Sequence, residues 1–348
     1  MGIQVLPREI AEKIAAGEVV ERPVSVIKEL VENSIDAGAL NIRISLEEGG
    51  RKLIRIEDDG SGILESEMLI ALERHATSKI TEIDDLWKIH TLGFRGEALP
   101  SVAAVSRFTL ESRTKNGKGR KVYLEGNRLM RDESLHAQSP LLQIPGTVCT
   151  VENLFFNLPA RLKFLKAKSS EVAAIRELIE RIALSHPKVS FTITSEGRKI
   201  LTLAAAKAES FEAVRAQRIA DVLEVKPETL IPFQLSYDRL SVQGWLDRDG
   251  RATNSRYLFL AVNGRMVRDK LLHQAVLTAL RPQMMEGEFP RIYVEVEIPP
   301  EDLDVNVHPA KSEVRFQKSR DVFSLIHAAL TKIALKPSDV AYNVKFND

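Results

Sequence analysis

The chain has 348 residues, more than a single domain usually contains, so we expect two domains. With 44% hydrophobic residues it is too apolar for a disordered chain, and 49 basic against 48 acidic residues exclude a uniformly basic DNA-coating protein. Cys149 is the only cysteine, which excludes an intrachain disulfide and argues against a thiolate zinc site. No apolar run approaches the ~18 residues of a membrane span, and the N-terminus lacks a signal-peptide core. We therefore expect a soluble, cytoplasmic protein.

The first half of the chain alternates helical and extended patterns. Residues 23–36 predict a helix, with Pro23 in its first turn and Gly38 just beyond its end. Residues 41–47 and 52–57 predict a hairpin, and residues 107–112, 120–125 and 147–152 predict further strands. A long helix is expected over 169–185, followed by a second hairpin over 191–204.

Residues 205–211 interrupt this pattern and are the expected joint between two domains. After the joint, helices are predicted over 211–223, 269–281 and 319–334, and strands over 239–246, 256–262 and 291–297. Strands that alternate with helices in both halves predict α/β sandwiches with helices on one sheet face. Residues 336–348 lack periodicity, and we expect them to begin a linker in a longer protein.

The predicted helix over 23–36 has two contrasting sides. Its apolar side consists of Val24, Ile27, Val31 and Ile35. Glu29, Asn33 and Asp36 fall on the opposite side. By themselves these three are best explained as the solvated face of a surface helix, although Asn33 is a poor helix former with no capping role there.

Two glycine-containing segments follow. The first, Asp58-Asp59-Gly60-Ser61-Gly62, comes directly after a strand. Its carboxylate could accept a hydrogen bond from an exocyclic amine such as that of adenine, and its glycines would let a flat ligand approach the backbone. For this motif taken alone, an ordinary Asp/Gly turn is the preferred explanation.

The second segment runs from His75 to Leu99 and has few regular elements. Gly93 and Gly96, ahead of a helix expected to start near Glu97, could present backbone N–H groups to a phosphate, with charge from Lys79 and Arg95. It is neither a Walker A loop nor a Rossmann fingerprint. A plain surface loop is the alternative, but loops of this length inside a domain are usually functional.

The order and spacing of the motifs are more specific than any one motif. They resemble the four ATP-binding motifs of the GHKL superfamily, in the order Glu29…Asn33, Asp58-x-Gly60-x-Gly62, Gly93-Phe94-Arg95-Gly96-Glu97 and Gly146-Thr147-x-Val-x-Val. The strings IAAGEVVERPVSVIKELVENSIDAGA, RHATSKI, LGFRGEAL and VNVHPAKSEVRF are similar to hallmarks of the MutL mismatch-repair family. This resemblance covers nearly the whole chain, up to about residue 335.

The resemblance implies an α+β protein, in which a GHKL (Bergerat) ATP-binding α/β sandwich precedes a ribosomal S5 domain 2-like α/β domain. The implied parts are an N-terminal dimerisation arm (1–20), the ATPase domain (21–204) with an ATP lid at about 75–99, the joint (205–211), a transducer and DNA-binding domain (212–335) and the start of a linker (336–348).

The resemblance also assigns roles in binding Mg-ATP. Glu29 would be the general base that polarises the attacking water, and Asn33 would bind Mg²⁺. Asp58 would read adenine with support from Thr147, while Gly60 and Gly62 admit the ring. Asp36 is counted with the nucleotide site. The lid residues near the nucleotide would be Thr77, Ser78, Lys79, Gly93, Phe94, Arg95, Gly96, Ala98 and Leu99.

Lys311, in the string His308-Pro309-Ala310-Lys311, would reach from the second domain toward the γ-phosphate. A lysine that touches only the phosphate that is lost would make the arrangement of the domains depend on the nucleotide. His308 could be taken for a general base, but Glu29 already fills that role, so we expect His308 to be structural.

Two basic clusters are candidates for sequence-independent contacts with DNA phosphates. The first consists of Arg161, Lys163, Lys166 and Lys168, for which solvated side chains are an equal alternative. The second consists of Arg265, Arg268 and Lys270, in a region that the family uses in its DNA-binding groove.

The implied function is a slow ATPase that dimerises on binding ATP and acts as a DNA clamp. It would couple mismatch recognition by MutS to a nicking endonuclease and a helicase, in the cytoplasm at the nucleoid. Alternatives are a catalytically silent ATP-binding scaffold and another GHKL ATPase such as a topoisomerase subunit. A nuclease is the other rival class, but the DQHAxxERxxYE metal-binding string is missing from these residues, so we expect no nuclease activity here.

Overall fold

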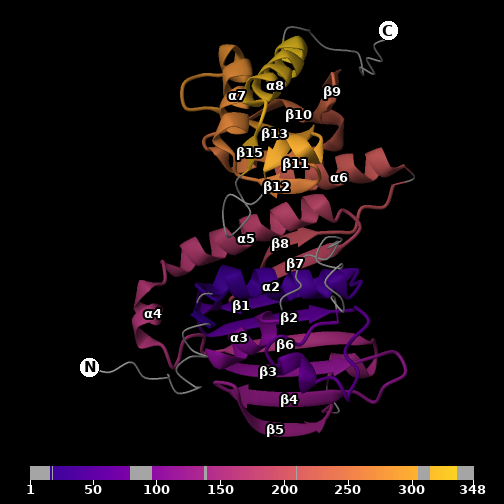
Figure 1. The fold of residues 1–348 in the computed structure, drawn as a ribbon, viewed down its shortest axis with the longest axis vertical. Coiled ribbons are helices and arrows are strands. Elements are labelled where there is room, and N and C mark those ends of the chain that lie inside the picture. The colour runs from indigo at the N-terminus through magenta and orange to yellow at the C-terminus, as the bar shows by residue number, and fades with distance from the viewer. Residues whose placement is uncertain are drawn as a thin grey trace. The chain divides into compact units, whose positions relative to one another are not determined.

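The computed structural model describes residues 16–17, 19–78, 96–136, 139–208, 210–304 and 314–334. The chain divides into two compact units (Figure 1). The first comprises the residues up to 179 together with 189–205, and the second comprises 180–188 together with the residues from 206 on. The expected joint at 205–211 contains this crossing, whereas residues 180–188, expected in the first domain, group with the second unit.

The first unit is built on an eight-stranded sheet with the order β5-β4-β3-β6-β2-β1-β7-β8. Neighbouring strands are antiparallel except β1 and β7, which are parallel. The strands are β1 (Asn41–Glu47), β2 (Leu53–Asp58), β3 (Arg107–Arg113), β4 (Arg120–Glu125), β5 (Arg128–Ser134), β6 (Gly146–Glu152), β7 (Ser190–Ser195) and β8 (Arg198–Leu203).

One face of this sheet is apolar and covered by helices. Alternate residues of β1, β2 and β7 are buried, as is typical of a sheet with one packed face. The covering helices are α2 (Pro23–Asp36), α3 (Ala98–Ala104) and the first part of α5 (Lys168–Ser185). Cys149, on the central strand β6, lies in this core. The short helix α4 (Pro159–Phe164) precedes α5.

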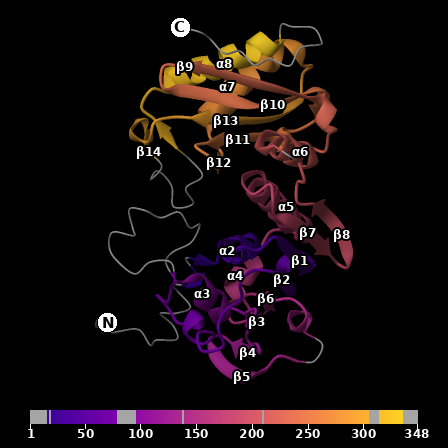
Figure 2. The same ribbon diagram turned by 90° about the vertical axis from the view of Figure 1, so that its right-hand side faces the viewer.

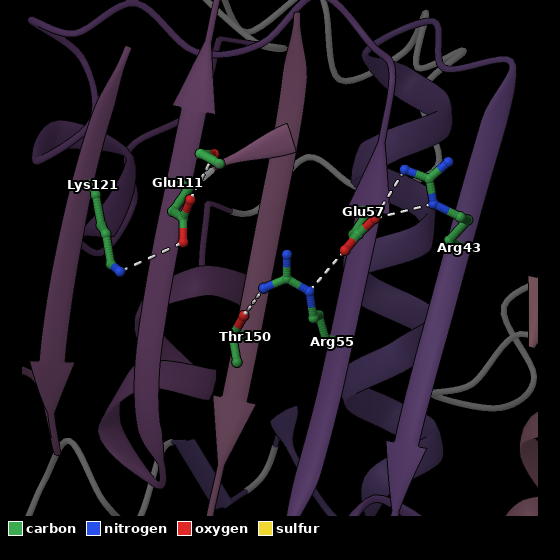
Figure 3. Close-up of polar contacts among 7 residues, drawn as sticks. Arg43, Arg55, Glu57, Glu111, Lys121 and Thr150 are labelled. Carbon is green, nitrogen blue, oxygen red and sulfur yellow. Dashed lines mark hydrogen bonds and ion pairs between the residues drawn. The ribbon is translucent and has the colours of Figure 1, made fainter. Parts of the chain in front are cut away.

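The other face of the sheet is polar (Figure 3). Glu57 lies between two arginines, accepting from Arg43 Nη2 at 2.9 Å and from Arg55 Nε at 2.8 Å. Arg55 Nη1 also donates to Thr150 Oγ1 at 3.2 Å. These contacts run from β1 through β2 to β6. The solvent-facing side chains of neighbouring strands are thus linked by ion pairs and by one hydrogen bond to a hydroxyl.

The second unit contains a five-stranded sheet with the order β12-β11-β13-β10-β9. Helices α7 and α8 pack on one face over a continuous apolar core (Figure 2). On the other face, Arg215 of α6 contacts Glu295 and lies 5.3 Å from the ring centre of Trp245. The elements are α6 (Phe211–Leu223), β9 (Leu230–Tyr237), β10 (Leu240–Ala252), β11 (Leu258–Val262), β12 (Arg265–Val267), α7 (Lys270–Leu280), β13 (Phe289–Glu297) and α8 (Ser319–Ala334), with a small pair β14 (Leu303–Asp304) and β15 (Arg315–Phe316).

Most predicted elements are present with bounds that differ by a few residues, and α2, α6 and α8 match the predicted ranges. The predictions missed β5, β9, β12 and α4, and also the two-residue strands β14 and β15. Every residue of β5 is exposed, so this edge strand has no apolar alternation to detect. Helix α4 is only six residues long and has no buried residue. None of the helices in the described ranges is long and apolar enough to cross a lipid bilayer.

Candidate functional site

The polar side of helix α2 lies at the edge of the packed core of the first unit. Glu29, Asn33 and Asp36 are half-buried, so they are neither packed inside nor fully solvated. The buried residues of the helix are Pro23, Val26, Ile27, Leu30, Val31 and Ser34. Val24 and Ile35, predicted to be part of the packed side, are only half-buried. The packed stripe is therefore rotated slightly from its predicted position and includes the polar Ser34.

A lysine that sequence reasoning missed holds the carboxylate of Glu29. Lys28 Nζ lies 3.1 Å from Glu29 Oε1 and 2.8 Å from Glu32 Oε2. Burial opposes the charge on Lys28, but the neighbouring carboxylates of Glu29 and Glu32 outweigh it and raise the pKa of Lys28. Burial also raises the pKa of Glu32, against the effect of Lys28. The i, i+4 spacing of Lys28 and Glu32 is the only sequence signal for this group.

The Asp58 carboxylate, at the end of β2, accepts three hydrogen bonds from within the fold. Ser34 Oγ donates to its Oδ2 at 2.8 Å, and the backbone N–H groups of Gly60 and Thr147 donate to its Oδ1 at 2.9 and 3.2 Å. Burial raises the pKa of Asp58 above its ordinary value of 3.8, and these hydrogen bonds only partly offset that effect. A carboxylate has about four acceptor positions, so the three donors leave room for one more.

Thr147 has its hydroxyl proton engaged within the fold. Ser112 Oγ donates its single proton to the Gly146 carbonyl at 3.0 Å, while the Ile63 N–H donates to Ser112 at 2.8 Å. The Thr147 hydroxyl, 2.9 Å from Ser112 Oγ, must then be the donor of that pair. Its oxygen keeps its acceptor positions. Asp58 and Thr147 therefore both present acceptors, which suits a ligand that carries an amine.

The glycines after Asp58 are needed by the protein's own packing. A Cβ at Gly60 would lie 2.9 Å from Ala37 Cβ, and one at Gly62, which has a φ of +73°, would lie 2.3 Å from the Arg113 carbonyl oxygen. Close backbone packing accounts for these glycines whether or not a ligand approaches them. Asp59, for which the sequence predicted no role, accepts from the backbone N–H groups of Leu40 and Asn41 at 2.8 Å and joins β2 to the start of β1.

The ends of the predicted lid lie against each other. The His75 N–H donates to the Gly96 carbonyl at 3.1 Å. A Cβ at Gly96, which has a φ of +63°, would lie 2.5 Å from the Ala76 carbonyl oxygen. Thr77, Ser78, Ala98 and Leu99 border this contact along the chain, and α3 begins at the predicted place. Lys79, Gly93, Phe94 and Arg95 lie outside the described residues, as do Lys311 and His308 and most of the expected 1–20 arm.

The first basic cluster is partly engaged within the first unit. Arg161 Nη1 donates to the carbonyls of Gly17 and Val20, the latter at 2.7 Å. Lys168 Nζ pairs with Glu48 at 3.2 Å. Lys163 and Lys166 are exposed. In the second unit, Arg265, Arg268 and Lys270 are all exposed, around the turn before β12 and the start of α7, whose first turn is capped by Asp269.

No metal site is preassembled in the part of the chain that is described, since no group of three or more His, Cys, Asp or Glu side chains there could hold an ion. The amide oxygen of Asn33 is nevertheless the kind of hard donor that Mg²⁺ prefers. A Mg²⁺ ion held by few protein ligands takes the others from substrate phosphates and water. The donor set is thus compatible with a magnesium–nucleotide complex.

Two family models match the chain, one in each unit. The model described as "Histidine kinase-, DNA gyrase B-, and HSP90-like ATPase" matches residues 21–144. The model described as "DNA mismatch repair protein, C-terminal domain" matches residues 222–335.

Individual proteins give the same result. The DNA mismatch repair protein MutL of Geobacter sulfurreducens is 43% identical over 331 residues, which are 94% of this chain and 52% of the relative. The chain thus spans about half the length of the curated relatives it matches. The ATPase domain of Aquifex aeolicus MutL complexed with ADP aligns with a TM-score of 0.59 and 28% identity, covering 81% of this chain and 94% of that one.

A second structure of the ATPase domain of Aquifex aeolicus MutL, named there as a mismatch repair endonuclease, aligns with a TM-score of 0.64 at 26% identity. It covers 91% of this chain and 100% of that one. The expected α+β class, with a GHKL sandwich followed by an S5-like domain, is confirmed. Matched in both units by models and by relatives, the chain belongs to the MutL family of DNA mismatch repair proteins and corresponds to the part of them that carries the GHKL ATPase fold.

Proposed function

We propose that this chain binds Mg-ATP in its first unit and hydrolyses it slowly. The observation that carries the proposal is the pair of acceptors at Asp58 and Thr147, which is fixed by the fold and suits the adenine amine. The ADP complex of the Aquifex relative supports an adenine nucleotide as the ligand. Gly60 and Gly62 would line the ring, with Asp36 nearby on α2.

Hydrolysis would depend on the half-buried side of α2. A carboxylate at Glu29 can hold and orient the attacking water and accept its proton. Lys28 Nζ, 3.1 Å from Glu29 Oε1, keeps this carboxylate oriented in the absence of nucleotide. Asn33 would hold Mg²⁺, which when bound neutralises charge on the phosphates. An ATP-binding scaffold without turnover is the alternative.

The phosphates would be enclosed by residues before and after the contact between the two ends of the predicted lid. From the family resemblance we assign this role to Thr77, Ser78, Lys79, Gly93, Phe94, Arg95, Gly96, Ala98 and Leu99. Lys311 would contact the γ-phosphate, so that the second unit responds to hydrolysis. Lys311→Ala is then expected to slow turnover without weakening ADP binding.

The wider role follows from the family. We propose that ATP binding dimerises the chain through its N-terminal region and closes a clamp on DNA, at the nucleoid in the cytoplasm. The clamp would relay mismatch recognition by MutS to a nicking endonuclease and a helicase. The exposed cations Arg265, Arg268 and Lys270 support sequence-independent binding of phosphates.

The test is the solution mass of Glu29→Ala, measured by light scattering with and without Mg-ATP, together with its ATP turnover. We expect ATP to bind, turnover to be lost, and a monomer to become a dimer only when ATP is present. Glu47→Ala, which removes a surface carboxylate paired with Lys52, is the matched control and should behave as wild type. Unchanged turnover in Glu29→Ala would refute the role of the base.

The other outcomes separate the parts of the proposal. Failure of the wild-type chain to bind ATP would refute the nucleotide site itself. A monomer that holds ATP would contradict dimerisation by this part of the protein. A dimer without nucleotide, unchanged when nucleotide is added, would contradict an ATP-driven clamp.

A further inference from the structure

The first turn of α2 is anchored by an ion pair between the partly exposed Arg22 and a buried carboxylate. Arg22 is the N-cap residue, yet its side chain does not cap the helix. Instead its Nε and Nη2 donate to Glu171 Oε2 at 3.1 and 3.0 Å. The Glu171 side chain, in the first turn of α5, is 1% exposed. A buried carboxylate needs such a partner because loss of the water around it is costly.

The turn between β1 and β2 packs closely against both helices next to this ion pair. A Cβ at Gly50 would lie 2.9 Å from Pro23 Cβ, and one at Gly49 would lie 2.9 Å from the Lys168 carbonyl oxygen. Both glycines have positive φ, +67° at Gly49 and +88° at Gly50. The turn is therefore wedged between the first residue of α2 and the first turn of α5. We call this three-way contact the α2 anchor.

Further bonds hold the segment just before α5 to the residue that follows that turn. Arg51 Nη2 donates to the carbonyls of Leu165, at 3.2 Å, and Lys166. The second oxygen of Glu171 accepts from the Lys166 N–H at 3.3 Å. Glu171 is thus bonded on both oxygens, to the segment before α5 and to the start of α2. It is the buried charge at the centre of the α2 anchor.

The far end of α2 is held separately. Ser34 bonds Asp58 at 2.8 Å, and the Ala37 carbonyl accepts from the Ser61 N–H at 2.9 Å. Glu29 lies between the two attachments, seven residues or ~10 Å of helix rise from Arg22. Loosening of the first turn would therefore move Glu29 while the Ser34 end stays bonded to the adenine-binding carboxylate.

We propose that Glu171 is a positioning residue for hydrolysis: through Arg22 it fixes the first turn of α2 and so the direction of the Glu29 carboxylate. This inference rests on the proposed ATPase function. A base must hold its water in line with the phosphate, and a misplacement of ~1 Å can cost ~100-fold in rate. Nucleotide affinity, in contrast, depends on the opposite end of the helix.

The experiment compares turnover and affinity in Glu171→Gln, which keeps the side-chain volume and removes the charge. We expect kcat for ATP to fall by about 10-fold or more, while the Kd for ADP stays within about twofold. Arg22→Gln should show the same split, and the double variant should be no worse than either single one because both act through one contact. Lys52→Gln, which breaks an exposed ion pair of the same hairpin, is the matched control.

Hydrogen exchange supplies a readout that needs no hydrolysis. In Glu171→Gln, amides of residues 24–28 should exchange faster than in wild type, and amides of residues 34–40 should not. Equal loss of turnover and ADP affinity, or unchanged exchange at residues 24–28, would overturn the positioning role. A wild-type chain that binds ADP but does not turn over ATP would instead refute the proposed function, and the exchange result would still decide whether Glu171 fixes the helix.

Discussion

At the scale of single residues, Asp58 is bonded within the fold and is, on our proposal, also a contact for the nucleotide. Its oxygens accept from the Ser34 hydroxyl, from the Gly60 N–H in the turn after β2 and from the Thr147 N–H on β6. These donors fix the carboxylate before any ligand arrives, which removes the cost of ordering it on binding. The acceptor position that they leave open is the part of Asp58 available for recognition.

Asp58→Asn should separate these two uses. The amide can satisfy the same neighbours, because its oxygen can accept from Gly60 and Thr147 while its nitrogen donates to Ser34 Oγ, whose proton then goes to the Leu30 carbonyl. We therefore expect a change in Tm of no more than a few degrees. Affinity for ADP should fall about 10- to 100-fold, because a charge-assisted hydrogen bond contributes about 1.5–3 kcal/mol.

Titration calorimetry with ADP and a thermal melt measure the two quantities. The control is Asp132→Asn, the same substitution on the edge strand β5. Asp132 forms a surface ion pair with Arg120 of the neighbouring strand β4. If Asp58→Asn bound ADP as tightly as wild type, Asp58 would not contact the base.

At the scale of elements, the β1–β2 hairpin depends on Glu57. Burial tends to raise the pKa of Glu57, but hydrogen bonds and charge from Arg55 and Arg43 outweigh it and lower the pKa below 4.5. A carboxyl whose pKa is lowered by folding stabilises the protein above its unfolded pKa, and this contribution is lost as the pH falls through the folded value. The hairpin should therefore weaken in acid.

Glu57→Gln is expected to lower the free energy of unfolding by about 1 kcal/mol at pH 7, with a discount because Arg43 is largely exposed. Between pH ~5 and ~3 the wild type should lose more stability than the variant, because only the wild type loses this charge. Urea unfolding followed across that range gives the comparison. Glu133→Gln on the exposed strand β5 is the control, and parallel pH curves for wild type and Glu57→Gln would contradict the assignment.

Element bounds were predictable where the pattern is local. Helix α2 has Pro23 at its start and an apolar period along its length, and both signals depend on neighbouring residues. Strand β5 has neither. The bonding around Asp58 could not be predicted from local patterns, because Ser34 and Thr147 come from a helix and a strand far apart in sequence. Family resemblance supplied Thr147 but not Ser34, and nothing indicated that Arg22 pairs with Glu171, 149 positions away.

At the scale of the whole molecule, the net charge is close to zero, but basic side chains cluster locally on the surface. The second unit carries exposed Arg265, Arg268 and Lys270 within six positions of the chain. In the first unit, Arg161 and Lys168 already have partners inside the fold. DNA affinity should therefore depend more on the second cluster than on the first.

The double variant Arg265→Ala/Lys270→Ala should bind DNA less tightly than wild type, and its DNA affinity should depend less steeply on salt concentration. Each lost phosphate contact lowers the slope of log K against log salt by about 0.9, so a loss of nearly 2 is expected. Fluorescence anisotropy with duplexes of unrelated sequence, from ~50 to ~200 mM salt, measures it. Lys115→Ala/Lys118→Ala removes two exposed lysines after β3 and should leave the slope unchanged. An unchanged slope in the first variant would exclude those contacts.

The burial of Cys149 has a practical consequence for studying this molecule. The thiol lies in the packed core on β6, and burial raises its pKa, so that the reactive thiolate is scarce. The folded chain should not react with Ellman's reagent, whereas the denatured chain should yield one thiol. A cysteine introduced at an exposed position, such as Lys115→Cys, would then be the sole labelling site without removal of the native one. A dye or spin label placed in this way would test whether the labelled segment responds to the proposed nucleotide.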